Sequence, residues 1–411
     1  MSTAGLTVNF ERLMGQLAKI NSINRQPDGS CCRLALTDSD RRGRDLVVGW
    51  MREAGFEVRV DHIGNIIGVR PDGYGDGAVM TGSHIDTVAT GGPYDGTLGV
   101  LAGLEVARTL EEAGIRTRRP IAVVVFTNEE GVRFQPDMMG SLVFAGGLPL
   151  PSALRAVGSD GTVVGEELER IGYAGTAPCG QIRPSAFVEL HIEQGPVLDR
   201  EGGVLGAVQD LQGISWQEIT VYGASNHAGT TPMNLRHDAA HCLGKTIVFI
   251  RELTRRMGGT QVATVGSVQL IPNLVNVIAR EVRFTVDLRN TDDKLLQSAE
   301  AELTHFVRGL EASEGVEVRA RPLVRTEPVR FDEDVLRVIE SVARDLGAPV
   351  RRMTSGAGHD AQMLSRVCPT AMIFVPSVGG VSHSPREHTA AEHLRLGVSA
   401  LLHTLLQLAD R

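Results

Sequence analysis

The chain has 411 residues, more than one compact core usually holds, so we expect two domains. A net charge of −8 argues against a polyanionic partner, and an aromatic content of 4% argues against a surface that stacks nucleic-acid bases. The most apolar segment, residues 121–126, is far too short to cross a bilayer, so we expect no membrane partner.

The start of the sequence lacks the basic stretch and apolar run of a secretory signal. The five cysteines form no CxxC pair, and an odd number of thiols fits a reducing compartment better than a disulfide framework. We therefore expect a cytoplasmic protein.

Residues 1–211 alternate helical and extended patterns. The apolar spacing predicts helices at 8–20, 40–54 and 97–113, and strands at 57–61, 65–70, 78–84, 121–130 and 186–195. Such alternation is typical of an α/β domain with a mixed, mostly parallel sheet and helices on both faces. Ligands bind such sheets beyond the carboxyl ends of the strands.

The pattern changes near residue 212. Strands are expected at 214–223, 262–270, 280–289 and 315–325, with helices at 235–257 and 292–313. This β-α-β-β-α-β order is typical of an α+β ferredoxin-like domain, whose exposed edge strands favour pairing with a second copy. A helix at 333–346, a strand at 370–377 and a helix at 390–408 then restore the first pattern. We therefore expect a metal-binding catalytic domain at 1–211 and 328–411, with an inserted domain at 212–327.

Side chains of the types that bind metals stand in separate turn-rich or strand-end motifs: His84 in GSHIDT, Asp95 in GGPYDG, Glu130 in TNEEG, His191 in ELHIEQG and His383 in GGVSHSP. Three imidazoles and two carboxylates suit two divalent metals of the zinc class. Glu129 directly precedes one of these residues. A hydrolytic metal site needs an extra acid of this kind to take a proton from the attacking water.

Some of these motifs have simpler explanations. Asp86 can fix the tautomer of His84 by accepting its second ring N–H, or it can cap a helix. Asp95 can bridge two metals, or it can cap the helix at 97–113. His191 can be a core histidine with satisfied hydrogen bonds.

Two groups of polar residues belong to the inserted domain. If that domain closes over the metals, His227 can donate to a developing oxyanion, and Arg289, which follows Asn276 along the chain, can grip a carboxylate. The alternatives are an N-cap network at helix 235–257 for His227, and an ion pair with Asp287 or Asp292 for Arg289. From the residues alone these alternatives are favoured.

Together GSHIDT, GGPYDGTLGV, TNEEG, ELHIEQGPVLD, NHAGTTPMNLRHD, PNLVN, SGAGHDAQ and SHSP resemble the dinuclear-metal amidohydrolases that cleave ureido groups. This zinc-peptidase-like group includes N-carbamoyl-L-amino-acid hydrolase, allantoate amidohydrolase and β-ureidopropionase. The resemblance covers about residues 8–408. The histidine in HIEQG, where the wider group of metallopeptidases has an acid, points to the ureido-cleaving branch.

The resemblance implies that one metal is held by His84 and His191 and the other by Glu130 and His383, with Asp95 bridging and Glu129 as general acid/base. It further implies that the substrate is contacted by Gln194, His227, Asn276, Arg289 and the backbone of Gly358. In this group the smaller domain acts as a lid and mediates dimerisation, and its histidine reaches the partner's active site. The resemblance thus favours catalytic roles for His227 and Arg289, and a homodimer.

We therefore expect metal-dependent hydrolysis of the ureido C–N bond of an N-carbamoyl-L-amino acid, a small molecule with a free carboxylate, giving amino acid, ammonia and carbon dioxide. Two divalent ions per subunit, from zinc, manganese, cobalt or nickel, suit this set of side chains. The enzymatic alternatives are an allantoate amidohydrolase and a hydrolase of N-acyl amino acids or dipeptides. The other alternative is a metal carrier without turnover, against which the spare acid Glu129 argues.

Overall fold

The computed structural model describes residues 5–71 and 77–410, so the first four residues of the segment inspected for a signal lie outside it. The chain divides into two compact units, one of residues 1–209 and 331–411 and one of residues 210–330. These limits lie within three residues of the expected domain boundaries. In the described ranges no helix is long and apolar enough to cross a membrane.

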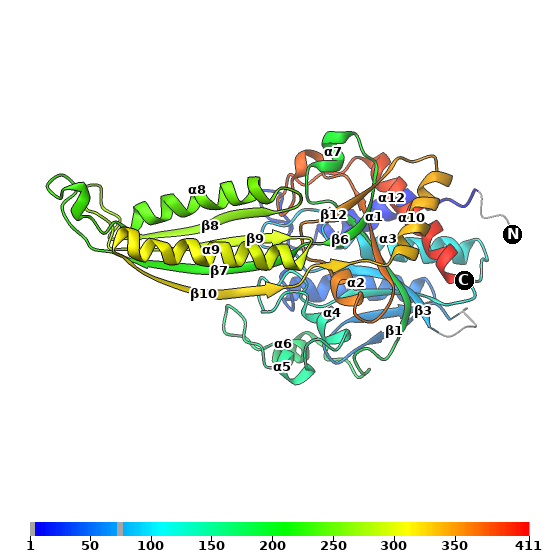
Figure 1. Cartoon of the computed structure of the whole chain (residues 1–411). Helices are drawn as coiled ribbons and strands as arrows, with labels where there is room; N and C mark the ends of the chain where they lie inside the picture. Colours follow the sequence, from blue (N-terminus) through cyan, green and yellow to red (C-terminus); the bar gives the residue numbers. More distant parts are fainter. Residues whose placement is uncertain (1–4, 72–76, 411) are drawn as a thin grey trace. The chain divides into compact units, whose positions relative to one another are not determined.

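The first unit, residues 1–209 and 331–411, contains most of the helices and nearly all of a nine-stranded sheet (Figure 1). Its elements up to the second unit are α1 Phe10–Asn21, α2 Asp38–Glu53, β1 Glu57–Val60, β2 Ile66–Val69, β3 Ala78–His84, α3 Thr97–Glu112, β4 Ile121–Phe126, α4 Met139–Phe144, α5 Leu150–Leu154, α6 Val164–Ile171, β5 Pro184–Ile192, α7 Val197–Glu201 and β6 Leu205–Leu211. The last two residues of the second unit form β11 Val329–Arg330, which also pairs into this sheet. The chain then returns to the first unit with α10 Glu333–Asp345, β12 Val350–Ser355, α11 Asp360–Leu364, β13 Thr370–Val375 and α12 Ala391–Ala409.

The nine-stranded sheet is parallel at its centre and antiparallel at its margins. Its strand order is β1-β2-β4-β3-β5-β13-β6-β11, with β12 beside β6. Strands β4, β3, β5 and β13 run parallel, whereas β1, β2, β6 and β11 join antiparallel. The central strands are buried along almost their whole length, as expected for strands covered on both faces. The expected mixed α/β fold is thus confirmed.

Helices cover both faces of this sheet. A Cβ on Gly397 of α12 would lie 3.2 Å from the Leu190 side chain of β5. The neighbouring β5 residue, Glu189, instead accepts a hydrogen bond from the Ala361 backbone of α11, at 2.8 Å. Because successive side chains of a strand point to opposite faces, α12 and α11 pack on opposite sides of β5.

Two strands end earlier than the sequence pattern predicts. Strand β4 stops at Phe126 rather than at 130, and β5 stops at Ile192 rather than at 195. The backbone φ is +55° at Asn128 and +59° at Gln194, a left-handed conformation that a strand cannot continue through. The chain therefore turns at both places, and the polar residues that follow each strand lie in loops.

The second unit, residues 210–330, has the expected β-α-β-β-α-β order. Its elements are β7 Gly213–Tyr222, the 3₁₀ turn η1 Met233–Leu235, α8 Ala239–Met257, β8 Val262–Ile271, β9 Glu281–Asn290, α9 Asp293–Glu314 and β10 Glu317–Thr326. The four strands form an antiparallel sheet in the order β10-β7-β9-β8. Alternate residues of β9 join the buried faces of α8 and α9 in one core, so both helices lie on one face of the sheet (Figure 1).

A substitution at Gly82 in β3 tests how closely the backbones of β3 and β4 approach each other. The φ of this glycine is +148°, and a Cβ there would lie 2.0 Å from the carbonyl oxygen of Val124 in β4. We expect Gly82→Ala to lower the free energy of unfolding by about 2–4 kcal/mol, because backbone strain and overpacking add. Gly49→Ala in α2 is the matched control: no atom lies within 4 Å of its added Cβ, and we expect a gain of about 0.4–1 kcal/mol. Urea unfolding followed by circular dichroism measures both, and equal stabilities would contradict this packing.

Candidate active site

Three neighbouring parallel strands deliver polar residues to one edge of the sheet. Strand β3 ends at His84, which pairs in register with Phe126, the last residue of β4. Glu129 and Glu130 follow in the turn after β4, and His191 lies near the end of β5 on the other side of β3. Since the carboxyl ends of parallel strands meet at one edge, residues over 100 positions apart become neighbours.

The five expected metal ligands gather there as two clusters that share Asp95. In the first cluster, Asp95 Oδ1 lies 3.2 Å from His191 Nε2 and 3.8 Å from His84 Nε2. In the second, Asp95 Oδ2 lies 3.2 Å from His383 Nε2, which lies 3.7 Å from Glu130 Oε2. Within each cluster the ligand atoms lie within 4.8 Å of one another. Each oxygen of one carboxylate therefore faces a different cluster.

Asp95 does not cap the following helix, which was the simpler explanation for this residue. Helix α3 begins at Thr97 with Gly96 as its N-cap and no side-chain hydrogen bond. Gly96 has φ +59°, and a Cβ there would lie 2.3 Å from His84 Nε2, so only glycine fits beside the ring. Gln194 Nε2 donates to Asp95 Oδ2 at 2.9 Å, which holds the carboxylate toward the clusters.

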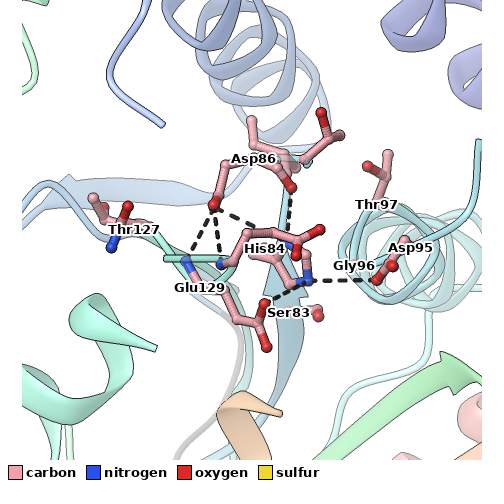
Figure 2. Close-up of polar contacts among 12 residues, drawn as sticks. Ser83, His84, Asp86, Asp95, Gly96, Thr97, Thr127 and Glu129 are labelled. Carbon is pink, nitrogen blue, oxygen red and sulfur yellow. Dashed lines mark hydrogen bonds and ion pairs between the residues drawn. The ribbon is translucent and has the colours of Figure 1, made fainter. Parts of the chain in front are cut away.

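Asp86 acts differently from the expectation. The atom within hydrogen-bond range of His84 Nδ1 is the backbone oxygen of Asp86, at 2.9 Å, while the carboxylate oxygen lies 3.9 Å away. The carboxylate instead accepts from the backbone N–H of Glu129, at 3.3 Å (Figure 2), and from that of Glu130, at 3.2 Å. Accepting the Nδ1–H of His84 fixes the ring tautomer that leaves Nε2 free as a ligand, whether the acceptor is the backbone oxygen or the carboxylate. Asp86 thereby orients both glutamates as well as the histidine.

Glu129 lies beside the first cluster. Its Oε2 is 3.4 Å from His84 Nε2, and Figure 2 shows the ring between Glu129 and Asp95. Burial, reinforced by the carboxylates of Asp360 and Glu130, raises the pKa of Glu129 well above its usual range. An acid with a raised pKa can carry a proton near neutral pH.

The charges of the site fit divalent cations. Burial and the Asp95 carboxylate raise the pKa of Glu130 well above its usual range. Burial also opposes ionisation of Asp95, but its contacts with His191 and His383 outweigh this and keep the pKa of Asp95 well below its usual range. Buried carboxylates that repel one another gain most from a cation in their midst, and mixed imidazole and carboxylate ligands suit zinc or manganese. The donor set thus fits two divalent metals.

Several buried residues at this edge were missed by the sequence analysis. His359 Nε2 lies 3.0 Å from Ser355 Oγ, and its ring centroid is 4.6 Å from that of His191. Burial, with His191 nearby, keeps the pKa of His359 well below its usual range, which favours the neutral ring. The motif SGAGHDAQ contains His359 and Asp360, but the resemblance assigned a role there only to Gly358. Burial at a strand-to-helix turn was the missing information.

A cavity of about 170 Å³ opens on these residues. It is lined by Asp95, Glu129, Glu130, His191, Gln194, Gly358 and His383, which the sequence analysis named, and by Asp137, Met138, Ala357 and His359, which it did not. Four of the five expected ligands, the expected acid Glu129 and two expected substrate contacts therefore line one cavity of the first unit, and only His84 of these ligands does not.

The other expected substrate contacts lie in the second unit. The loops of His227 and Asn276 run side by side, since Ala228 N donates to the Asn276 backbone oxygen at 2.9 Å, and both residues are exposed. Helix α8 is capped by Asp238, so the N-cap alternative for His227 is wrong. The ion-pair alternative for Arg289 is found, with the guanidinium 2.8 Å from Asp287 Oδ2.

Comparisons with known proteins agree with this geometry. The sequence profile of the peptidase family M20/M25/M40 matches residues 80–407. An N-carbamoyl-L-amino acid amidohydrolase of Geobacillus stearothermophilus is 40% identical over 98% of this chain and 99% of its own. An allantoate amidohydrolase of Bacillus subtilis is 35% identical over 93% of each chain.

A solved structure gives the same result for the fold. The crystal structure of an amidase of the hydantoinase/carbamoylase family from Burkholderia multivorans superposes with a TM-score of 0.96 at 44% identity, covering 99% of each chain. The resemblance drawn from the motifs is thereby confirmed. The chain belongs to the peptidase family M20/M25/M40, in the group of its N-carbamoyl-L-amino-acid and allantoate amidohydrolase relatives.

Proposed function

We propose that the protein hydrolyses the ureido C–N bond of an N-carbamoyl-L-amino acid, releasing the amino acid, ammonia and carbon dioxide. The observation that carries the proposal is the pair of ligand clusters sharing Asp95, with Glu129 beside them. The similarity to an N-carbamoyl-L-amino acid amidohydrolase along almost the whole chain supports the choice of substrate. The allantoate amidohydrolase relative makes allantoate the second candidate.

The metals would be held by the two clusters. His84, His191 and Asp95 would bind one ion, and Asp95, Glu130 and His383 the other. A pair of divalent ions supplies Lewis acidity, which polarises the ureido carbonyl and makes water easier to deprotonate. Zinc, manganese, cobalt and nickel all accept these ligands.

The residues of the chain would move the proton and orient the substrate. Glu129 takes a proton from the attacking water and returns it to the leaving nitrogen, so its side chain ends each cycle unchanged. Gln194 and the backbone of Gly358, which line the cavity, would contact the substrate. The products are a free amine and a carbamate that decomposes to ammonia and carbon dioxide.

The second unit would supply the remaining contacts. His227 would donate to the developing oxyanion, while Asn276 and Arg289 bind the free carboxylate of the substrate. We further propose that this unit serves as a lid and pairs two copies in a homodimer, with His227 acting on the partner's substrate. The partly exposed pair of Arg289 with Asp287 fits this role, because such a pair is worth little and exchanges readily.

Replacing Glu129 tests proton transfer. Glu129→Gln keeps the size of the side chain but removes the proton carrier, so we expect kcat to fall by about 10²–10⁴-fold with unchanged metal content. Ammonia release from N-carbamoyl-L-amino acids and allantoate, and amino-acid release from N-acetyl amino acids, measure the activity, and elemental analysis of the same samples measures the metal content. The control is Glu166→Gln, an exposed residue of α6, which should change neither quantity. Full activity in Glu129→Gln would exclude this mechanism, and release from allantoate alone would favour the second candidate.

The affinity for metal should rise with pH. Burial favours the neutral His191 ring, but the contact with Asp95 outweighs it and raises the pKa of His191 to about 9. In the metal-free protein this imidazole is therefore protonated below about pH 9, and a metal must displace the proton. We expect the affinity for zinc to fall about tenfold per pH unit for each displaced proton as the pH drops from 9 to 6. Competition with a chelator of known protonation measures this, and a constant affinity over that range would contradict it.

Arg289 tests the carboxylate requirement. Removal of its charged hydrogen bonds in Arg289→Ala should lower kcat/KM for N-carbamoyl amino acids by roughly 10–100-fold, chiefly through KM. The matched control is Arg283→Ala, on the same strand and paired with Glu281 at 3.7 Å, which should leave kcat/KM unchanged. For a substrate whose carboxylate is replaced by a carboxamide, kcat/KM should be the same in wild type and in Arg289→Ala. Equal losses in both variants would assign Arg289 a structural role.

A further inference from the structure

A buried glutamate without an assigned role joins the two loops that carry Asp95 and His383. Glu387 is 4% exposed and belongs to the loop before α12. Its Oε1 accepts from the backbone N–H groups of Tyr94 and Asp95, at 2.9 and 3.2 Å. Its Oε2 accepts from Ser382 Oγ at 2.9 Å, one residue before His383. One carboxylate thus fixes both loops across nearly 300 positions of sequence.

The second ligand cluster depends most on such a contact between loops. The His383 side chain is 50% exposed, whereas Asp95 is 4% and Glu130 8% exposed. The backbone φ of His383 is +52°, an unfavourable conformation for a residue with a side chain. Only the surroundings can hold such a residue in place, and the loop is fixed by Ser382 through Glu387 and by Thr90, whose Oγ1 donates to the His383 backbone oxygen at 3.1 Å.

The chain leaves space for this glutamate. A Cβ on Gly92 would lie 2.3 Å from the carboxyl carbon and Oε1 of Glu387. The φ of Gly92 is not in the left-handed region, so the backbone itself does not require glycine. Glycine at 92 is therefore explained by the close approach of the Glu387 carboxylate to the loop that carries Asp95.

We propose that Glu387 is a positioning residue that presets Asp95 and His383 for the second metal ion. Both residues belong to the cluster of Asp95, Glu130 and His383, and Glu387 contacts the backbone or the neighbour of each. Groups that orient metal ligands typically change metal affinity by about 10–100-fold when removed. The proposal rests on the proposed function in that the cluster must bind a metal.

Metal affinity rather than activity tests the proposal. Metal-free wild type, Glu387→Ala and Glu387→Gln are titrated with zinc alone against a competing chelator, and the unfolding temperature of each metal-free protein is recorded. We expect Glu387→Ala to bind one of the two ions about 10–100-fold more weakly. We expect Glu387→Gln to stay close to wild type, because its amide oxygen still accepts from both backbone N–H groups.

A matched control separates positioning from general stability. Glu105 is fully buried and accepts from Asn9 N at 2.8 Å and from Arg12, away from the metal clusters. Glu105→Ala should lower the unfolding temperature and leave zinc affinity unchanged. Should Glu387→Ala fail to fold, Gly92→Ala provides a second test. Its methyl group must displace the Glu387 carboxylate, and we expect this to weaken binding of the same ion.

The outcomes are distinguishable. The proposal is overturned if Glu387→Ala binds zinc as tightly as wild type. The same holds for Gly92→Ala if that variant has to be used instead. An equal loss of zinc affinity in Glu105→Ala also overturns it. Failure of Glu387→Gln to restore the affinity also overturns it, because the hydrogen bonds that the side-chain oxygen accepts from the two backbone N–H groups would then not be the cause. A wild-type protein that binds no divalent metal would instead refute the proposed function.

Discussion

The burial of several carboxylates at one edge of a sheet is the constraint on which the structure depends. Asp86, Asp95, Glu129 and Glu130 are all nearly inaccessible to solvent, and like charges so close together destabilise one another. Histidines on two sides of Asp95 relieve part of this repulsion, and each of its oxygens faces a separate group of ligand atoms. The arrangement is costly as a purely structural feature and favourable as a receptacle for cations.

Backbone N–H groups of the fold donate hydrogen bonds to two of the buried carboxylates and so hold the loops of the site in place. Asp86 holds the turn of the two glutamates through their N–H groups, and Glu387 holds the turn of Asp95 in the same way. Gly92 leaves room for the Glu387 carboxylate, and Gly96 leaves room for the His84 ring. Rigid strands supply His84 and His191, whereas His383 comes from a loop that must be tied down. The proposed ligands and the proposed acid are therefore held by hydrogen bonds from loops that lie far apart in the sequence.

Much of this organisation could be predicted from the sequence, because it follows from local patterns. Apolar runs that end in polar motifs identified β3, β4 and β5, and parallel strands place their ends together, so His84, Glu130 and His191 were expected at one edge. The strand alternation between 213 and 326 likewise indicated the antiparallel sheet of the second unit. Gln194, Gly358 and the pairing of His383 with Glu130 on one metal came from resemblance to a family, whereas His383 itself was a candidate ligand from its motif.

The remainder depends on contacts that no local pattern encodes. The carbonyl rather than the carboxylate of Asp86 meets the His84 ring because of the turn geometry after β3. Glu387 stands in a loop of Pro, Arg and His residues, where an acid is ordinarily solvated, and only the folded chain brings it to Tyr94 and Asp95. The left-handed backbone at Asn128 and Gln194, which ends two strands early, is equally invisible to apolar periodicity.

Anomalous diffraction at the zinc or manganese edge tests the central claim most directly. Crystals of the metal-loaded protein should give two peaks per chain, one next to each oxygen of Asp95 and about 3.5–4 Å apart. A single peak, or two peaks that do not share Asp95, would contradict the account of a carboxylate that joins two metal sites.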